Sequence, residues 1–306
     1  MRIVFIATGD IALPSFRRLL EKGPRPLALV TQPDKPAGRH MTPTPPRIKT
    51  EALAAGIPVF QPERIGDATT DLAALEPDLL IVVAYGQILR KNILTLPRKA
   101  IINLHASLLP KYRGAACIQA AIDAGDAESG VTSMHVVREL DAGDIILARS
   151  IPIAPDDTGG SLHDKLADLA ADVMEETITL MDAGTDTRTP QDPDLVSYIP
   201  KLDRNDGRID WSMPAAAIER RIRAYDPWPG TFTIALENGR ERRLKVFPPV
   251  RCLDETFAPG ELRTNDGRLV IGCGEGALEL LHVQPDGGRR ITAADYLRGR
   301  VPQAFV

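Results

Sequence analysis

The sequence predicts an α/β protein of two parts: a Rossmann-like N-terminal domain with a parallel-sheet core and a C-terminal OB-like β-barrel domain. Two observations lead to this fold class. Residues 1–150 alternate short apolar runs with amphipathic stretches, the pattern of parallel strands joined by helices. Residues 207–306 contain short strand-like runs separated by glycine and proline, which is typical of a small barrel or sandwich.

Chain length agrees with two domains. The 306 residues are about twice the usual domain length, and 43% apolar with 25% charged residues is ordinary for a globular protein. The stretch from Asp182 to Asp194 is rich in turn formers and poor in apolar residues, so the boundary is expected near it. We therefore expect domains at 1–184 and 207–306, joined by a linker at 185–206.

The elements of the first domain follow from hydrophobic periodicity. Apolar side chains spaced as one helix face predict helices that end near Gly23, Gly56 and Pro77. Alternation predicts a later hairpin, and a longer helical pattern follows it. The predicted strands are 2–7, 27–31, 79–84 and 99–104, the helices 13–21, 48–55, 68–76 and about 161–182, and the hairpin strands 130–137 and 145–153.

The second domain begins with one short helical pattern and continues as strands. The helix is expected at 215–224. The predicted strands are 231–236, 243–249, 269–272 and 277–283. Short strands with frequent turn residues between them predict a closed or nearly closed β-structure.

Several classes of protein are excluded by signals that the sequence lacks. Cys117, Cys252 and Cys273 have no paired spacing and the five histidines are scattered, so no metal site and a reducing compartment are expected. The apolar segment 1–9 is too short for a signal sequence, and no stretch approaches the ~20 apolar residues of a membrane span. A cytoplasmic protein is therefore expected.

Dinucleotide binding is also disfavoured, because only Gly9 follows the first strand where three spaced glycines are required.

The strongest local signal is the segment 103–114, Asn-Leu-His-Ala-Ser-Leu-Leu-Pro-Lys-Tyr-Arg-Gly. It starts at the end of a predicted strand, and in an open α/β sheet ligands bind at the carboxyl ends of strands. Asn103 and His105 are two residues apart, so both side chains face the same side of that strand. An amide that holds an oxyanion beside an imidazole that moves protons is what acyl transfer requires. Such a pair on its own is more often a hydrogen-bonded turn.

A third group is expected to orient the imidazole, and Asp141 is the candidate. It lies in the glycine-containing loop 138–144, directly after the first strand of the predicted hairpin. Alone, Asp141 would be interpreted as a solvated turn carboxylate. Together with Asn103 and His105 it completes a set of groups suited to proton management and oxyanion stabilisation.

The segment 103–110 closely resembles the signature Asn-x-His-x-Ser-Leu-Leu-Pro of folate-dependent formyltransferases, and Leu140–Asp144 resembles their Leu-Asp-x-Gly-Asp stretch. The resemblance implies catalytic roles for Asn103, His105 and Asp141, with 10-formyltetrahydrofolate as formyl donor and no metal. It also implies a folate site, although a core strand leading into a turn explains part of it equally well. The implied folate-binding residues are Ser107, Leu108, Leu109 and Pro110, and Tyr85, Gly86, Ile88 and Leu89.

Three further stretches, 31–39, 208–211 and 222–229, resemble the branch of this family that acts on methionyl-tRNA. Their order and separation suit that branch along essentially the whole chain. The resemblance implies a monomer that transfers the formyl group to the α-amino group of methionyl initiator tRNA, for translation initiation. The loop after Arg39 departs from the family pattern, because it has fewer lysines to contact the acceptor stem.

Charge is unevenly distributed between the two parts. Residues 207–306 hold 15 Lys and Arg against 13 Asp and Glu, whereas residues 1–206 hold 22 against 28. A tRNA is held by cations over a wide footprint, and the second domain contains three short basic clusters. One such cluster is more often a solvated face, but three in one domain favour a polyanion. The predicted tRNA-binding residues are Arg39, Arg220, Arg223, Arg242, Arg243 and Lys245.

Two alternatives stay open at this stage. The first is a formyltransferase for a small amine, such as an amino-sugar nucleotide or glycinamide ribonucleotide, which the basic second domain disfavours. The second is a non-catalytic folate- or RNA-binding protein. It is disfavoured because binding alone requires none of Asn103, His105 and Asp141.

Overall fold

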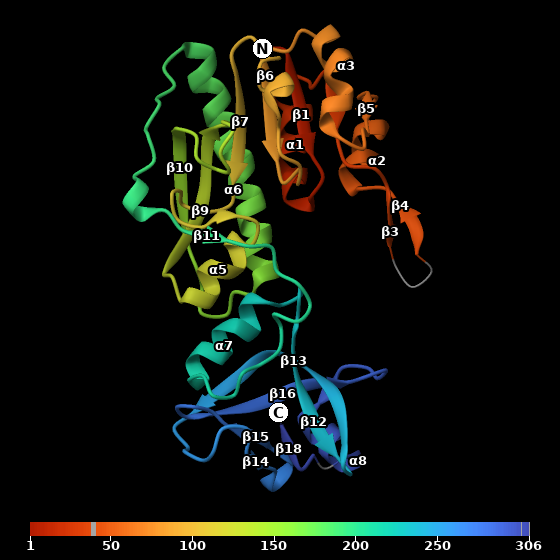
Figure 1. The fold of residues 1–306 in the computed structure, drawn as a ribbon, viewed down its shortest axis with the longest axis vertical. Helices are drawn as coiled ribbons and strands as arrows, with labels where there is room; N and C mark the ends of the chain where they lie inside the picture. The colour runs from red at the N-terminus through yellow and green to blue at the C-terminus, as the bar shows by residue number, and fades with distance from the viewer. Residues whose placement is uncertain (38–40, 301, 306) are drawn as a thin grey trace. The chain divides into compact units, whose positions relative to one another are not determined.

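The computed structural model describes residues 1–37, 41–300 and 302–305 (Figure 1). The chain divides into two compact units. The first contains residues 1–117, 128–151 and 163–199, and the second contains residues 118–127, 152–162 and 200–306. The ranges 1–184, 185–206 and 207–306 stay a prediction. In the structure, most of the expected linker clusters with the first unit.

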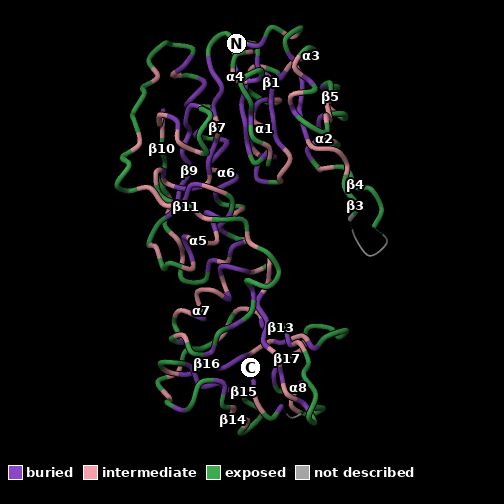
Figure 2. Tube along the Cα trace, viewed as in Figure 1, coloured by how far each residue is buried: buried purple, intermediate pink, exposed green. Residues whose placement is uncertain are grey.

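A seven-stranded sheet forms the centre of the first unit, with strand order β10-β9-β7-β6-β1-β2-β5. The strands from β7 to β5 are parallel neighbours, whereas β9 runs antiparallel to β7. The strands are β1 Ile3–Ala7, β2 Ala28–Val30, β5 Val59–Phe60, β6 Leu79–Val83, β7 Ala100–His105, β9 Glu128–His135 and β10 Ile145–Pro152. Both β1 and β6 are buried along their whole length (Figure 2), because helices cover both faces of the sheet.

Alternating side chains of β1 show how the two faces are covered. Phe5 packs on Phe16 of α1, with ring centroids 5.5 Å apart. Val4 and Ile6 point the other way and join a buried cluster with Leu72 of α3 and other residues. The helices of this part of the chain are α1 Leu13–Glu21, α2 Arg47–Ala54, α3 Thr69–Ala74, α4 Lys91–Leu94, α5 Cys117–Ala124 and α6 Gly159–Ala183, with short 3-10 turns η1 Asp10–Ala12, η2 Ile65–Ala68 and η3 Pro193–Leu195.

Two small strand pairs accompany this sheet. The hairpin of β3 Lys35–Ala37 with β4 Thr42–Thr44 flanks residues 38–40, so the predicted tRNA-binding residue Arg39 lies outside the described residues. The second pair joins β8 Arg113–Gly114 in parallel to β11 Tyr198–Ile199, 85 residues later in the chain. This second pair belongs to the candidate site.

The second unit is built around an antiparallel sheet in the order β14-β15-β16-β13-β12-β18, with β17 beside β16. The backbone N–H of Phe305, on edge strand β18, donates to the Gly260 carbonyl near the opposite edge strand at 3.4 Å, so the sheet nearly closes into a barrel. The elements are α7 Ala215–Ala224, β12 Thr231–Glu237, β13 Arg240–Leu253, β14 Leu262–Arg263, η4 Asn265–Gly267, β15 Leu269–Gly272, β16 Ala277–Pro285, β17 Ile291–Thr292, α8 Ala293–Gly299 and β18 Ala304–Phe305.

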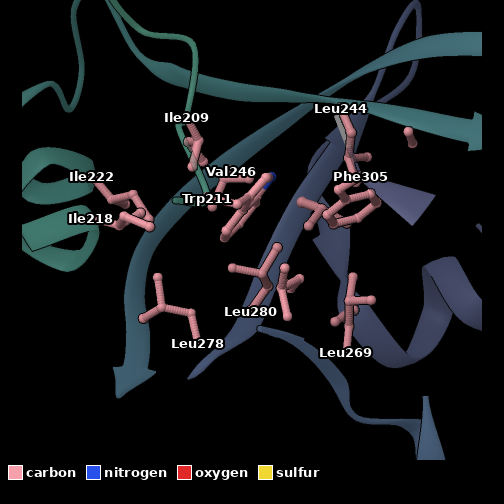
Figure 3. Packing of buried hydrophobic residues seen from close by; sticks show 14 of the residues in the cluster. Ile209, Trp211, Ile218, Ile222, Leu244, Val246, Leu269, Leu278, Leu280 and Phe305 are labelled. Atoms are coloured by element: carbon pink, nitrogen blue, oxygen red, sulfur yellow. The ribbon is translucent and has the colours of Figure 1, made fainter. Parts of the chain in front are cut away.

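Trp211 lies in the buried interior of the barrel (Figure 3). Its ring stacks on Phe305 with centroids 6.0 Å apart, and its indole N–H donates to the Thr233 hydroxyl at 3.0 Å. Ile218 and Ile222, four residues apart on α7, pack their common face against the same cluster. The ring is thus buried with its polar atom satisfied, as a core tryptophan requires.

The predicted fold class is confirmed, and the long elements agree with the periodicity. Each predicted strand and each long helix is present, with ends that differ by a few residues. The elements that were not predicted are short ones, such as β8, β11 and β18, because two-residue strands carry no periodic signal. Among the described residues, no helix is long and apolar enough to cross a membrane.

One buried group predicts how stability depends on pH. His135 of β9 is 6% exposed, and its Nε2 has no hydrogen-bond partner in the described part of the chain. Burial lowers the pKa of His135 below its ordinary value; Arg188 lowers it further, and Asp186 and Asp144 oppose the shift. The unfolded chain therefore binds a proton that the folded chain resists, and stability falls as pH drops below about 6.5.

We expect His135→Gln to reduce this acid sensitivity, because an amide does not titrate. The measurement is the thermal midpoint of both proteins at several pH values between about 7 and 5.5, across the ordinary pKa of histidine. The midpoint of the variant should fall less steeply. Identical slopes would show that His135 does not contribute.

Candidate active site

The carboxyl end of β7 carries the first two candidate residues. Asn103 and His105 pair with Met134 and Thr132 of β9, two positions apart, so their side chains lie on the same face of the sheet as predicted. Asn103 is half-buried, and among the described residues no hydrogen bond from its side-chain amide is recorded. The amide of Asn103 is therefore free to donate to a bound molecule.

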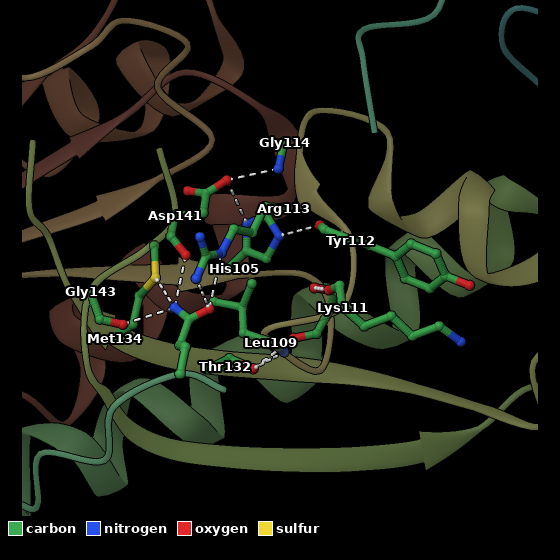
Figure 4. Close-up of polar contacts among 12 residues, drawn as sticks. His105, Leu109, Lys111, Tyr112, Arg113, Gly114, Thr132, Met134, Asp141 and Gly143 are labelled. Carbon is green, nitrogen blue, oxygen red and sulfur yellow. Dashed lines mark hydrogen bonds and ion pairs between the residues drawn. The ribbon is translucent and has the colours of Figure 1, made fainter. Parts of the chain in front are cut away.

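His105 lies between two oxygen atoms (Figure 4). Its Nε2 is 2.9 Å from the Tyr112 carbonyl oxygen, and its Nδ1 is 3.7 Å from Oδ2 of Asp141. A carbonyl oxygen only accepts, so Nε2 carries a hydrogen. The Nδ1 contact is too long for a hydrogen bond, so Nδ1 is the nitrogen left to exchange a proton. The carboxylate beside it stabilises the ring when both nitrogens are protonated.

Asp141 is held in an unusual backbone conformation, with φ +49°. Its Oδ2 accepts a hydrogen bond from the Gly114 backbone N–H at 2.9 Å. Two residues later, Gly143 has no room for a side chain, since a Cβ there would lie 1.8 Å from the His135 carbonyl oxygen. The Leu-Asp-x-Gly-Asp stretch therefore requires its glycine for close packing against β9, and this packing places the carboxylate.

Two residues that the sequence analysis did not select complete this arrangement. Gln191 donates from Nε2 to the carbonyl oxygens of Asp141 and Gly143, each at 2.8 Å. Arg113, which is 8% exposed, donates to the side-chain oxygen of Gln191. Arg113 stands inside the 103–114 segment and could have been suspected there. Gln191 lies in a stretch of linker-like composition, which gives no such signal.

The turn 107–110 is organised by Thr132 of β9. The Thr132 hydroxyl donates to the Ser107 carbonyl at 2.7 Å and accepts from the Leu109 N–H at 3.1 Å. Ser107 is buried and donates to the Lys111 carbonyl at 2.7 Å, so its hydroxyl holds the turn. Leu108 and Pro110 are partly exposed. Direct contact of residues 107–110 with folate stays a prediction, and the structure adds Thr132 as the residue that shapes them.

The segment 85–89 lies at the point where the strand order reverses, between β1 and β6. Ligands of open α/β sheets bind at this switch point. Gly86 and Ile88 are exposed there, Ile88 to 74%, whereas Tyr85 and Leu89 are buried in the core cluster. Burial also raises the pKa of Tyr85 to about 12, so its hydroxyl stays protonated. Tyr85 and Leu89 can thus support a folate site only from the core, by packing under its backbone, and not by direct contact.

The arginines of α7 are engaged within the second unit. Arg220 donates to the Asp123 carbonyl at 3.2 Å, and Arg221 pairs with the Asp123 carboxylate at 3.0 Å. Arg223 pairs with Glu219 at 2.5 Å. These contacts also explain why residues 118–127 cluster with the second unit. Contact of Arg220 and Arg223 with tRNA stays a prediction, but their side chains already have protein partners.

The outer face of the barrel carries arginines that lie on aromatic rings. We define the basic face as Arg243, Lys245 and Arg290 together with Phe232 and Phe247. Leu244 and Val246 point into the core, so the alternate residues of β13 point outward. The guanidinium of Arg243 lies 3.5 Å from the Phe232 ring centroid, and that of Arg290 lies 4.5 Å from the Phe247 centroid. In the described part of the chain no carboxylate pairs with Arg243 or Lys245. Arg242, by contrast, lies 3.7 Å from Glu237.

Within residues 1–37, 41–300 and 302–305, no group of three or more His, Cys, Asp or Glu side chains is arranged to hold a metal ion. Separately, the side chains that the site offers for chemistry are an amide, an imidazole and a carboxylate. These three groups suit oxyanion stabilisation and proton transfer.

Comparison with known proteins relates both parts of the chain to one family. The formyl transferase family pattern matches residues 1–178, and its C-terminal domain pattern matches residues 201–301. The methionyl-tRNA formyltransferase of Akkermansia muciniphila is 50% identical over 98% of this chain and 96% of its own length. That of Halorhodospira halophila is 45% identical over 98% and 96%, respectively.

Solved structures with low sequence identity share the fold. An N-formyltransferase from Helicobacter canadensis, in complex with folinic acid and dTDP-3-aminofucose, superimposes with a TM-score of 0.70 at 17% identity over 95% of this chain and 100% of its own. HypX from Aquifex aeolicus in complex with tetrahydrofolic acid gives a TM-score of 0.65 at 20% identity, covering 97% of this chain and 47% of that one.

Thr132→Val is expected to destabilise the first unit by about 1–3 kcal/mol, because it leaves the Leu109 N–H and the Ser107 carbonyl without their partner. Thr177→Val is the matched control: Thr177 is equally buried, and its hydroxyl donates only to the Val173 carbonyl of the preceding helical turn. Denaturant unfolding measures both. Equal destabilisation by the two changes would contradict a special role for Thr132.

Proposed function

We infer that this chain, which belongs to the formyl transferase family, transfers the formyl group of 10-formyltetrahydrofolate to the α-amino group of methionyl initiator tRNA. The identity of 50% over nearly the full length supports this assignment, since both the catalytic part and the C-terminal part are shared with methionyl-tRNA formyltransferases. The product serves translation initiation.

The observation that carries the proposed mechanism is the approach of Asp141 to His105 at the end of β7, where Asn103 lies on the same face of the sheet as His105. They come from one strand and a loop about 36 residues later, and the structure brings His105 and Asp141 within 3.7 Å. An amide with an uncommitted donor, an imidazole with one free nitrogen and a carboxylate form a set that a purely structural turn does not need.

The proposed reaction begins with the α-amine of the acceptor. Such amines have pKa values of about 8, and the ester bond to the tRNA lowers that pKa further, so the amine is largely neutral and requires little activation. Its nitrogen attacks the formyl carbon, the new C–N bond forms, and the carbonyl electron pair moves to oxygen. The Asn103 amide donates a hydrogen bond to this oxyanion. His105 takes the proton that the attacking nitrogen releases. It returns that proton to N10 of the folate as the C–N10 bond breaks.

Asp141 stabilises the imidazolium that forms between these two proton transfers. The ring stays attached to the Tyr112 carbonyl through Nε2, and Nδ1 faces the carboxylate while it holds the second proton. The carboxylate itself is kept in place by Gly114. His105 can thus accept and donate the proton without rotating, which keeps the reacting groups aligned.

The formyl donor is proposed to bind at the switch point between β1 and β6. Gly86 has φ +79° and adds no side chain of its own between the backbone and a flat ligand, and the Gln32 amide lies beside it. The exposed Ile88 offers apolar contact, and the turn 107–110 lies at the end of the neighbouring strand. Of the predicted folate-binding residues, we propose that the exposed ones contact the folate directly, namely Gly86, Ile88, Leu108 and Pro110. The buried ones support the backbone beneath it, namely Tyr85, Leu89, Ser107 and Leu109.

The tRNA is proposed to contact the basic face. Arg243 and Arg290 lie on aromatic rings, which fixes planar cations where phosphates or bases can meet them. Lys245 is exposed on β13, two residues after Arg243. Arg39 is proposed to help place the acceptor end, and the protein to act as a monomer in the cytoplasm.

The rival function is formylation of a small amine, since the Helicobacter canadensis enzyme was solved with a sugar nucleotide. That likeness, at 17% identity, concerns the fold. A small acceptor also has no use for a cationic face on a separate barrel. The basic face therefore favours tRNA over a sugar nucleotide as acceptor.

Asn103→Ala should reduce the single-turnover rate by about a hundredfold or more, the loss expected when an oxyanion donor is removed. Asn92→Ala is the control, because Asn92 is an asparagine of the same unit that bonds Thr69. Rapid-quench measurement with 10-formyltetrahydrofolate and methionyl-tRNA decides the question. A folded Asn103→Ala protein with near-native turnover would remove Asn103 from the mechanism.

Replacing Arg243 and Lys245 by Gln should weaken tRNA binding and flatten its salt dependence, by roughly 0.7–0.9 in the slope of log affinity against log salt for each lost phosphate contact. Arg263→Gln is the matched control. Arg263 also lies on an aromatic ring, Phe257, but it pairs with Glu255 at 3.6 Å. Binding titrations at several salt concentrations measure all three proteins. An unchanged slope for the double variant would favour the small-amine alternative.

A further inference from the structure

Gln191 uses both ends of its side-chain amide in a way that is unusual for a residue of a linker-like segment. Its nitrogen donates to the backbone carbonyls of Asp141 and Gly143 at 2.8 Å each, and it lies 3.9 Å from the Met134 sulfur. Its oxygen accepts two hydrogen bonds from Arg113, at 3.1 and 2.8 Å. The amide is therefore fully bonded, and its orientation is determined by its neighbours.

The two carbonyls that Gln191 binds enclose the turn that carries Asp141. Figure 4 shows Asp141, Gly143 and Met134 around one point, with Arg113 beside them. The left-handed backbone of Asp141 costs conformational energy that the surroundings must balance. Gln191 holds the turn from its backbone side, and the Gly114 N–H holds it through the carboxylate. Neither contact alone fixes both the backbone and the side chain of Asp141.

Gln191 is in turn fixed by Arg113. The guanidinium of Arg113 is buried and also donates to the Tyr198 hydroxyl at 3.1 Å. Arg113 is paired through its backbone with β11, since its N–H donates to the Ser197 carbonyl at 2.8 Å. The strand that presents Gly114 to the Asp141 carboxylate therefore also supplies the side chain that orients Gln191.

We propose that Gln191 is a positioning residue for the formyl transfer, which acts by holding Asp141 opposite His105. This proposal rests on the role of Asp141 in the proposed function. Both ends of the Gln191 amide bond to protein groups, so its proposed effect is on the placement of the carboxylate. A displacement of about 1 Å at a reacting group can cost up to a hundredfold in rate. The segment after α6 is thereby part of the catalytic unit.

The chemistry of the contacts requires an amide at position 191. A glutamate would accept from Arg113 as well or better, but it has no N–H to give to the two carbonyls and would repel them. Gln191→Glu therefore keeps the size and the Arg113 contact, and it replaces the hold on the turn by repulsion from the two carbonyls. Gln191→Met keeps the volume and removes both ends, and it serves as second variant if the glutamate protein does not fold.

The test is a double-mutant cycle of Gln191→Glu with Asp141→Asn in the full chain. Alone, Gln191→Glu should lower kcat about 10- to 100-fold, with KM values for 10-formyltetrahydrofolate and methionyl-tRNA within about twofold. In the Asp141→Asn background it should change kcat less than about twofold, because its target is already lost. Asn92→Asp, the same chemical change at a site outside the proposed machinery, is the control.

The outcomes separate this proposal from the function on which it rests. If Asp141→Asn alone leaves kcat unchanged, the proposed role of Asp141 fails. If Asp141→Asn lowers kcat and Gln191→Glu does not, only the role of Gln191 fails. Equal fold-losses from Gln191→Glu in both backgrounds, or a loss seen only in KM, would show that Gln191 acts elsewhere and would overturn the proposal.

Discussion

The hydrogen bond from the Gly114 backbone to the Asp141 carboxylate, 2.9 Å long, is the contact on which the rest of the candidate site depends. It joins a two-residue strand to a turn in the left-handed region, and neither is stable by itself. Gly114 has φ +110°, and a Cβ there would lie 2.3 Å from the Ile199 carbonyl oxygen. Only glycine allows β8 to pair so closely with β11 while its N–H points to Asp141.

Some arginines of the second unit form ion pairs and others lie on aromatic rings. Because of this difference, a count of arginines does not locate a nucleic-acid surface. Arg221 pairs with Asp123, and Arg223 pairs with Glu219. The positive charges of both arginines are therefore neutralised within the protein. Arg243 instead lies on an aromatic ring, which fixes its geometry without neutralising its charge. The second arrangement leaves a full positive charge available to a phosphate. The difference depends on long-range pairing, for which the net charge of a segment gives no information.

Periodicity predicted the fold because buried strands and long helices repeat their signal over several residues. The motif predicts catalytic roles for Asn103, His105 and Asp141, which stay a prediction, whereas the common face of the first two follows from their spacing and is confirmed. Gln191 and Thr132 were not predicted, since their partners are 50 and 25 residues away and a polar residue shows no sign of such contacts. The same limit applies to Tyr85, whose side chain turns into the core at the very end of an apolar strand.

The loop after β1 shows how this sheet differs from one that binds dinucleotides. A single glycine follows β1, and its N–H donates to the Ala84 carbonyl at 3.2 Å, so this N–H is not offered to a phosphate. Gln32 bonds the Tyr85 carbonyl at 2.5 Å and holds the two loops of the switch point together. The Gln32 side chain also accepts a hydrogen bond from Lys35, so this edge offers side-chain groups in place of a glycine-rich phosphate loop. The groups proposed for chemistry stand at the end of β7, next to β6, so the proposed folate site and the proposed reacting groups lie on neighbouring strands of one sheet.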